Sequence, residues 1–312
     1  MSGTTQPIRP TTVQEAAEAF FGHLRYRRKA EGTIKQWRPP LRDFAKWAGK
    51  RSPASLDTRE IEGFLSGWIA SFEQRNKREP SDHSIKNVIV ALRSLYKYLN
   101  DYGLLLHEGR PVKNPMLPIQ PPTPDPKVND WLRRSEDEAL LSAFFKTEDE
   151  RVIVWFLRWT GLRLGEALSL LISDLDLLEG TVYVRTSKTA RGRRAVPITD
   201  ELRLRIKHWL TVLEDRGLHK KDGPLFPSRY GNPWTQQYAQ RIVRRVGDRV
   251  EIERLTPHRL RRTFGSYLLN EGIRLEVVSK LLGHRSTEVT EQAYAELLDQ
   301  TIRKEMLTAL SG

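Results

Sequence analysis

The chain has 312 residues and contains no cysteine. This absence excludes a disulfide framework, thiolate zinc sites, iron–sulfur clusters and a cysteine nucleophile, and it fits a reducing compartment. No run of about 18 apolar residues is present, so a bilayer-spanning helix is not expected. The first residues, MSGTTQPIRPTTVQ, lack the apolar core of a signal peptide. We therefore expect a cytoplasmic protein without a membrane span.

Acidic residues are too few to balance the basic ones. Lys and Arg number 52 against 39 Asp and Glu, which gives a net charge of +13 and an isoelectric point near 9.9. Residues 1–107 carry +7, and residues 129–312 carry +5. Such an excess indicates a polyanionic partner, nucleic acid before an anionic membrane surface; a merely soluble basic protein is the alternative.

Proline is concentrated in one segment. Residues 114–126 read NPMLPIQPPTPDP, in which six of the thirteen positions are proline. Because proline fixes φ and removes backbone donors, the segment predicts an extended, semi-rigid linker. It divides the chain into an N-terminal domain (residues 11–105), a linker (106–128) and a C-terminal domain (129–312).

The N-terminal domain has helical periodicity throughout and no strand signal. Asp57 and Glu60 have capping-box spacing before the third of four apolar stripes. Pro39 and Pro40 predict a kink or a shifted start in the second stripe. A small four-helix bundle is therefore expected, with these apolar positions: Val13, Ala17, Phe20 and Leu24; Ile34, Trp37, Leu41 and Phe44; Ile61, Leu65, Trp68 and Phe72; Ile85, Val88, Leu92, Leu95 and Leu99.

A basic face is expected on the fourth of these helices. Lys86, Arg93 and Lys97 recur at helical spacing away from the apolar stripe. They form either a solvated face or a face that contacts DNA phosphates.

The C-terminal domain is predicted to be mostly helical with one small sheet. Ser135 and Glu138 have capping-box spacing before a helix, and VIVWFLRW indicates a buried helix. TVYVRT (181–186) and RRAVPI (193–198) are β-rich and are joined by a basic turn, so we expect a β-hairpin. The fold class is mainly α with a small β-hairpin or sheet.

Two motifs of this domain place arginine at the start of a helix. In TGLRLGEALSL, Arg163 follows a turn and has Glu166 on the same face, an arrangement that suits either phosphate binding or a structural ion pair. In TPHRLRRTF, Thr256 is a plausible N-cap, and His258 and Arg261 lie one above the other at the positive end of the helix. That end favours an anion, although such a pair is more often a surface feature.

Two later motifs end in a polar ring. LLGH closes a helix with Gly283 and places His284 just beyond it, where a histidine usually interacts with the helix dipole. Tyr294 follows in AYAEL, where packing is its ordinary role. Taken singly, neither motif identifies a site.

The order of these motifs is more specific than any one of them. The series Arg163, Lys188, His258-x-x-Arg261, Gly283-His284 and Tyr294 resembles the tyrosine site-specific recombinases, which include the phage integrases. The resemblance covers both domains, because this family joins a helical, SAM-like core-binding domain to a mostly helical catalytic domain.

The resemblance implies a role for each motif. Arg163, Arg261 and His284 would stabilise charge on a phosphodiester, with Glu166 in support. Lys188 would protonate the departing 5′-hydroxyl, and His258 would assist proton transfer. Tyr294 would form a covalent 3′-phosphotyrosine link, which conserves the energy of the broken bond. No metal or cofactor is then needed, in keeping with the absence of metal-binding and nucleotide-binding motifs.

Two details bear on these assignments. Tyr294 follows His284 by ten residues, where many relatives have nine, and Tyr267 is the nearest rival tyrosine. Arg191 and Arg259 are expected to contact DNA; Lys188 is kept as the acid because arginine stays protonated.

The expected substrate is double-stranded DNA at core or attachment sites. The resemblance implies a homotetramer on DNA, joined through the amphipathic C-terminal segment with Leu298, Ile302, Met306 and Leu310, and an accessory DNA-bending or directionality protein is compatible with it. Integration and excision of a phage or mobile element is the first interpretation. A chromosome-dimer-resolving, Xer-like recombinase is the alternative, and a non-catalytic helix–turn–helix regulator around Gly272 is the alternative of another class.

Overall fold

The computed structural model describes residues 10–29, 31–123, 130–185, 193–284, 286–291 and 293–294. The chain divides into two compact units, residues 1–126 and 127–312, each with its own hydrophobic core. No helix in the described ranges is long and apolar enough to cross a membrane.

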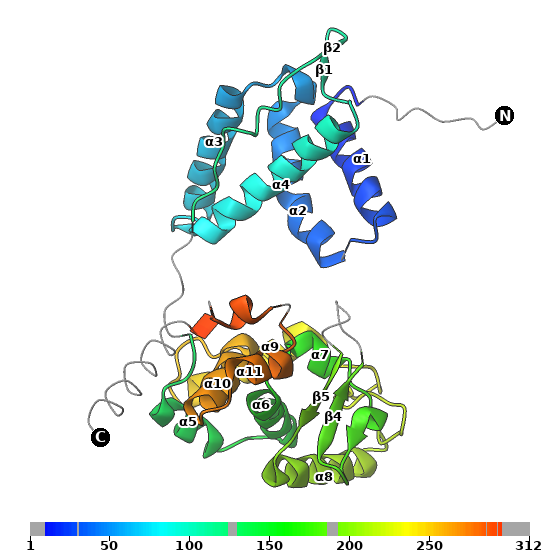
Figure 1. Cartoon of the computed structure of the whole chain (residues 1–312), viewed down its shortest axis with the longest axis vertical. Helices are drawn as coiled ribbons and strands as arrows, with labels where there is room; N and C mark the ends of the chain where they lie inside the picture. The colour runs from blue at the N-terminus through cyan, green and yellow to red at the C-terminus, as the bar shows by residue number, and fades with distance from the viewer. Residues whose placement is uncertain are drawn as a thin grey trace, which may run out of the picture. The chain divides into compact units, whose positions relative to one another are not determined.

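The first unit is built on four long helices (Figure 1): α1 (Val13–Tyr26), α2 (Glu31–Ala48), α3 (Thr58–Asn76) and α4 (Asp82–Asp101), with a short 3-10 turn, η1 (Pro53–Ser55), between α2 and α3. Most positions of the four predicted stripes are buried in one core, and Trp37, Trp68 and Ile85 pack against it partly buried. The capping box of Asp57 and Glu60 is present at the start of α3.

Two features of this unit differ from expectation. Pro39 and Pro40 lie inside α2, which continues through them as one helix, so the predicted shifted start is wrong and the kink stays a prediction. The segment after α4 also forms a two-stranded hairpin, β1 (Leu106–His107) with β2 (Arg110–Pro111), that carried no sequence signal. Met116 and Ile119 then join the core of the first unit, so much of the predicted linker packs on this unit.

The second unit is mostly helical and holds one three-stranded antiparallel sheet in the order β3–β4–β5. The predicted hairpin is confirmed as β4 (Thr181–Val184) paired with β5 (Arg194–Pro197). The remaining elements are α5 (Arg134–Leu141), α6 (Glu148–Thr160), α7 (Leu164–Leu168), η2 (Ile172–Asp174), β3 (Leu175–Asp176), α8 (Asp200–Asp215), α9 (Gln236–Arg249), α10 (Pro257–Asn270) and α11 (Leu275–Leu282).

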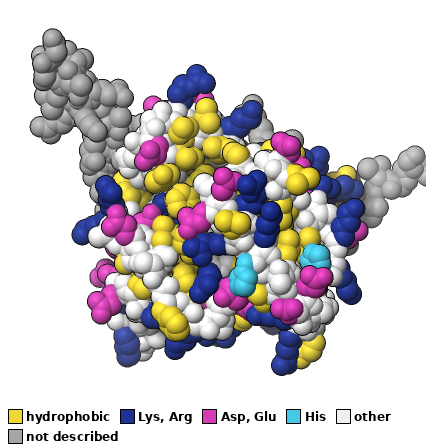
Figure 2. All heavy atoms as spheres, turned by 90° about the horizontal axis from the view of Figure 1, so that it is seen from below, with side chains coloured by type: hydrophobic (Ala, Val, Ile, Leu, Met, Phe, Trp, Pro, Cys, Tyr) yellow, Lys and Arg dark blue, Asp and Glu magenta, His cyan; other side chains and the backbone are white. Residues whose placement is uncertain are grey.

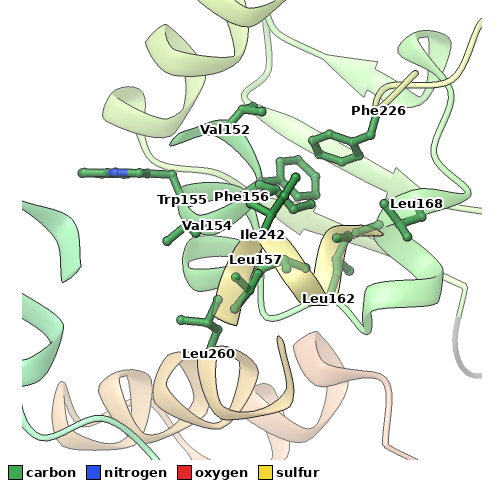
Figure 3. Packing of buried hydrophobic residues seen from close by; sticks show 14 of the residues in the cluster. Val152, Val154, Trp155, Phe156, Leu157, Leu162, Leu168, Phe226, Ile242 and Leu260 are labelled. Atoms are coloured by element: carbon green, nitrogen blue, oxygen red, sulfur yellow. The ribbon is translucent and has the colours of Figure 1, made fainter. Parts of the chain in front are cut away.

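Helix α6 is the centre of the second core. It contacts α8, α9 and α10, and Phe156 and Leu157 are fully buried among them (Figure 3). Phe156 meets Phe226 edge to face with ring centroids 5.3 Å apart. The predicted buried helix VIVWFLRW is thus confirmed as the element against which the others pack.

One predicted cap is wrong by two residues. Helix α5 begins at Arg134, and the Arg133 backbone N–H donates to Glu136 Oε2 at 2.7 Å. The spacing of Ser135 with Glu138 is repeated two residues earlier by Arg133 with Glu136, and the earlier pair caps the helix.

Basic and acidic side chains are mixed on the face of the molecule seen in Figure 2. In Figure 2, Lys and Arg side chains are interspersed with Asp and Glu, so the net charge of +13 does not form a single basic patch there.

A buried ion pair joins α5 to α6. The Arg158 side chain is 1% exposed, and its Nε and Nη2 donate to the two oxygens of Asp137 at 2.6 and 2.5 Å. Arg158 also lies 4.7 Å from the Trp159 ring centroid. Because a buried charge without its partner is costly, this pair should be essential to the second unit.

We expect Asp137→Ala to lower the free energy of unfolding by about 3–5 kcal/mol, because it leaves the Arg158 charge buried and unpaired. Glu138→Ala on the same helix is the matched control, since it removes the partner of exposed Arg134 and should cost less than about 1 kcal/mol. Urea titration of the full chain measures both changes, and equal effects would contradict the expectation.

Candidate active site

A glycine turn positions Arg163. Helix α6 ends at Gly161, whose φ of +61° lies in the left-handed region, and a Cβ there would meet Phe264 at 2.2 Å. The turn places Arg163 at the N-cap of α7, where its backbone N–H donates to Glu166 Oε2 at 2.9 Å. Arg163 Nη1 donates to the other oxygen, Oε1, at 2.9 Å. The Arg163 side chain remains 46% exposed, so the guanidinium is accessible to a ligand.

Arg261 lies beneath this turn. It is 4% exposed on α10, and it donates from Nη1 to the Gly161 carbonyl at 2.7 Å and from Nη2 to the Leu282 carbonyl at 2.5 Å. Burial and the neighbouring Arg163 charge lower the pKa of the Arg261 guanidinium. Arg261 therefore ties the end of α6 to the end of α11.

The C-terminal end of α11 is where the arginines converge. Consecutive carbonyls, those of Leu281, Leu282 and Gly283, accept from Arg194 Nε at 2.5 Å, from Arg261 Nη2 at 2.5 Å and from Arg163 Nη2 at 3.1 Å. The last carbonyls of a helix have no intrahelical partners and carry partial negative charge. Three positive side chains satisfy them here.

Glu166 is the anion of this cluster. It is 7% exposed, and Arg194 donates to its Oε1 at 3.3 Å and to its Oε2 at 3.1 Å. Burial alone would raise the pKa of Glu166, but the hydrogen bonds and charges of Arg194 and Arg163 outweigh it and lower that pKa. Glu166 is thus ionised at neutral pH, and two arginines, Arg163 and Arg194, bind its carboxylate.

His284 directly follows this helix end. Its Nδ1 is 2.7 Å from Thr290 Oγ1, and Thr290 is fully buried. Burial, followed by the charges of Arg261 and Arg163, lowers the pKa of His284 to about 4. His284 is therefore neutral at pH 7 and retains one N–H donor.

Tyr294 lies in a small apolar cluster with Phe264, Leu269, Val278 and Leu282. It is 1% exposed, its hydroxyl donates to the Arg262 carbonyl at 3.2 Å, and burial raises its pKa to about 12. The hydroxyl lies against helix α10 at Gly265, where a Cβ would approach it to 2.0 Å. The phenol is therefore protonated at neutral pH and buried away from solvent.

Comparison with known proteins agrees with this geometry. Residues 130–301 match the phage integrase family, and residues 17–103 match its N-terminal SAM-like domain. The chain is 32% identical over 294 residues to the tyrosine recombinase XerC of Pseudomonas fluorescens strain Pf-5, with 91% of this chain and 92% of that protein covered. It is 30% identical to the tyrosine recombinase XerA of Saccharolobus solfataricus, with 94% and 92% covered.

The chain belongs to the phage integrase family of tyrosine recombinases. It is a site-specific DNA recombinase, an enzyme that cleaves and rejoins DNA.

Solved structures share the fold of this recombinase. The XerH recombinase bound to its difH substrate after cleavage superposes with a TM-score of 0.71 at 20% identity, covering 96% of this chain and 85% of that one. The Tn1549 transposon integrase in complex with transposon right end DNA gives 0.70 at 20% identity, covering 94% and 98%.

The structure brings together Arg163, Glu166, Arg261 and His284 of the expected site in the recombinase. His258 is exposed at the start of α10, and its Nε2 is 3.3 Å from Arg262 Nε. The expected acid Lys188 and the expected DNA contact Arg191 lie outside the described residues, as does the C-terminal segment with Leu298–Leu310.

The expected DNA contacts are placed less favourably. Arg259 is 15% exposed and donates from Nη2 to both oxygens of Glu136 at 3.1 Å, so it serves an internal ion pair. In the first unit, Arg93 donates to the Ile119 carbonyl and Lys97 lies 2.9 Å from Asp101, while Lys86 is half-buried. Tyr267, the rival tyrosine, packs edge to face on Trp159.

Arg194 also belongs to the cluster, and the sequence analysis did not assign it a role there. A signal was available in the strand alternation. Arg194 has the same parity as Val196, which is fully buried, so its side chain points inward from β5. The described residues contain no group of His, Asp and Glu that would hold a metal ion.

We expect the His284 ring of the recombinase to titrate with a midpoint near pH 4, well below the value of about 6.5 for an exposed histidine. Its burial beside Arg261 and Arg163 disfavours the charged form. NMR titration of the ring Cε1–H measures the midpoint, and His284→Gln assigns the signal. A midpoint above pH 6 would show that His284 is not enclosed by this cluster.

Proposed function

We propose that Tyr294 cleaves DNA at a phosphodiester held by the arginine cluster at the end of α11. Its oxygen would attack phosphorus, the bond to the 5′-oxygen would break, and Lys188 would give that oxygen its proton. The tyrosine proton would leave with the assistance of His258. The 3′-phosphotyrosine keeps the bond energy, so rejoining by a 5′-hydroxyl needs neither metal nor nucleotide.

The observation that carries this proposal is the convergence of Arg163, Arg261 and His284 on one helix end. A phosphodiester gains negative charge on its non-bridging oxygens as it is attacked, and preorganised donors stabilise that charge. Arg163 offers the accessible guanidinium, and Arg261 adds positive charge from beneath. Neutral His284 retains an N–H donor for an oxygen.

Cleavage also requires that Tyr294 leave this buried position. Its hydroxyl is bonded to the Arg262 carbonyl, and its raised pKa makes it a poor nucleophile there. We infer that DNA binding releases Tyr294 from this contact and lets the arginines lower the pKa of the phenol.

The proposed partner is double-stranded DNA at core or attachment sites, bound by a homotetramer in the cytoplasm at the nucleoid. The XerH recombinase and the Tn1549 integrase were both solved in complex with DNA, which supports this partner. A tetramer joined through the C-terminal segment and an accessory DNA-bending or directionality protein belong to the same proposal.

Two biological uses fit this chemistry. The match to the phage integrase family supports integration and excision of a mobile element. The identities of 30–32% to proteins named XerC and XerA favour the second use, resolution of chromosome dimers. Recombination assays on plasmids with the site in direct repeat, built from the sequence flanking the gene or from the chromosomal terminus, distinguish the two.

We expect wild-type recombinase to form an SDS-resistant adduct on a nicked suicide duplex whose core is selected from a random library by binding to the full chain. Tyr294→Phe should lose the adduct completely and keep its DNA affinity, because only the attacking oxygen is removed. Tyr267→Phe is the matched control and should keep the adduct. An adduct on Tyr294→Phe, or its loss on Tyr267→Phe alone, would refute the assignment.

A further inference from the structure

Arg194 is as enclosed as Arg261 and far less exposed than Arg163. Its side chain is 4% exposed, whereas that of Arg163 is 46% exposed. Its guanidinium donates to protein groups, the Glu166 carboxylate and the Leu281 carbonyl. Any contribution of Arg194 to catalysis must therefore pass through the groups that it contacts.

Those contacts connect Arg194 to Glu166, through Glu166 to Arg163, and to the end of α11. From the start of β5, Arg194 donates to both oxygens of Glu166 and to the Leu281 carbonyl. Glu166 in turn accepts from the Arg163 guanidinium and from its backbone N–H. Arg194 thus fixes the carboxylate that orients Arg163, and it fixes the last turn of the helix that precedes His284.

The close approach at Gly283 shows how tightly this arrangement is packed. Gly283 closes α11 with a φ of +65°, and a Cβ there would lie 2.7 Å from Arg194 Nη1 and 3.0 Å from its Cζ. The glycine is required both by its backbone conformation and by the guanidinium beside it. Arg194 therefore occupies space that a side chain would otherwise fill.

The charges explain why a second arginine on Glu166 matters. A carboxylate with two oxygens free to rotate could hold Arg163 in several geometries, and its charge would oppose binding of a phosphate. Arg194 engages both oxygens and compensates that charge. With three arginines and one carboxylate, the cluster keeps an excess of two positive charges at neutral pH. Arg163 is the member of the cluster that is exposed to a ligand.

We propose that Arg194 is a positioning residue for DNA strand cleavage, which holds Glu166 and the C-terminal end of α11 so that Arg163 and His284 meet the phosphate. The inference rests on the proposed function of the cluster. It predicts an effect of Arg194 on the rate of the chemical step and little effect on DNA affinity, which the exposed basic groups determine.

The test is single-turnover cleavage of the suicide duplex at saturating recombinase, with the dissociation constant measured separately. We expect Arg194→Ala to lower the cleavage rate constant about 100-fold and to change the dissociation constant less than threefold. Arg193→Ala is the matched control: it removes the same charge one residue away, from an exposed side chain, and should retain the wild-type rate.

Two further measurements separate positioning from a loss of folding. Glu166 keeps both contacts to Arg163 in an Arg194 variant, so no charge is left unpaired and the unit should still melt cooperatively. Arg194→Lys keeps the charge but cannot span Glu166 and Leu281 together, so it should stay at least tenfold slow. Millimolar methylguanidinium should partly restore Arg194→Ala and leave Arg194→Lys unchanged.

The outcomes are distinguishable. A folded Arg194→Ala that cleaves within threefold of wild type overturns the inference and leaves the proposed function intact. Equal slowing by Arg193→Ala, or a loss that appears only in the dissociation constant, also overturns it. Failure of wild-type recombinase to form any adduct on a bound core duplex would instead overturn the proposed function. If Arg194→Ala does not fold, Arg194→Lys at the wild-type rate would be the contradicting result.

Discussion

The C-terminal end of helix α11 determines how the arginines of the site are arranged. Three successive carbonyls, those of Leu281, Leu282 and Gly283, point out of the helix without intrahelical partners, and each accepts from a different arginine. The three arginines come from β5, α10 and the turn before α7, which are far apart in the chain. One helix terminus therefore sets the distances among groups that no local segment could place together.

The same terminus links stability to chemistry. Each arginine is oriented by a carbonyl of α11 before any ligand arrives, so the cost of ordering its long side chain is met in folding, and little reorganisation remains for catalysis. The neutral state of His284 and the protonated state of Tyr294 follow from the same burial. The free recombinase thus combines an ordered charge cluster with the proposed nucleophile, Tyr294, whose hydroxyl is buried and bonded to the Arg262 carbonyl.

The sequence predicted the features that depend on residues close together in the chain. The apolar stripes, the β4–β5 hairpin, the N-cap at Thr256 and the closure of α11 by Gly283 all depend on residues near one another, and all are confirmed. The continuity of α2 through Pro39 and Pro40, the packing of Met116 into the first core and the internal ion pair of Arg259 depend on tertiary contacts. Arg194 was missed for the same reason, because its partners are 28 and 87 residues away in the chain.

We infer that the packing of arginine against the end of α11 controls cleavage. Gly283→Ala tests it most directly, with Gly272→Ala as its control: both glycines have positive φ, at +65° and +77°, but a Cβ at Gly272 meets nothing within 4 Å. The measurement is the single-turnover cleavage rate constant of each variant on saturating core duplex. We predict that Gly283→Ala cleaves at least tenfold more slowly than Gly272→Ala with similar affinity for DNA. Equal rates for the two variants would show that this packing does not control cleavage.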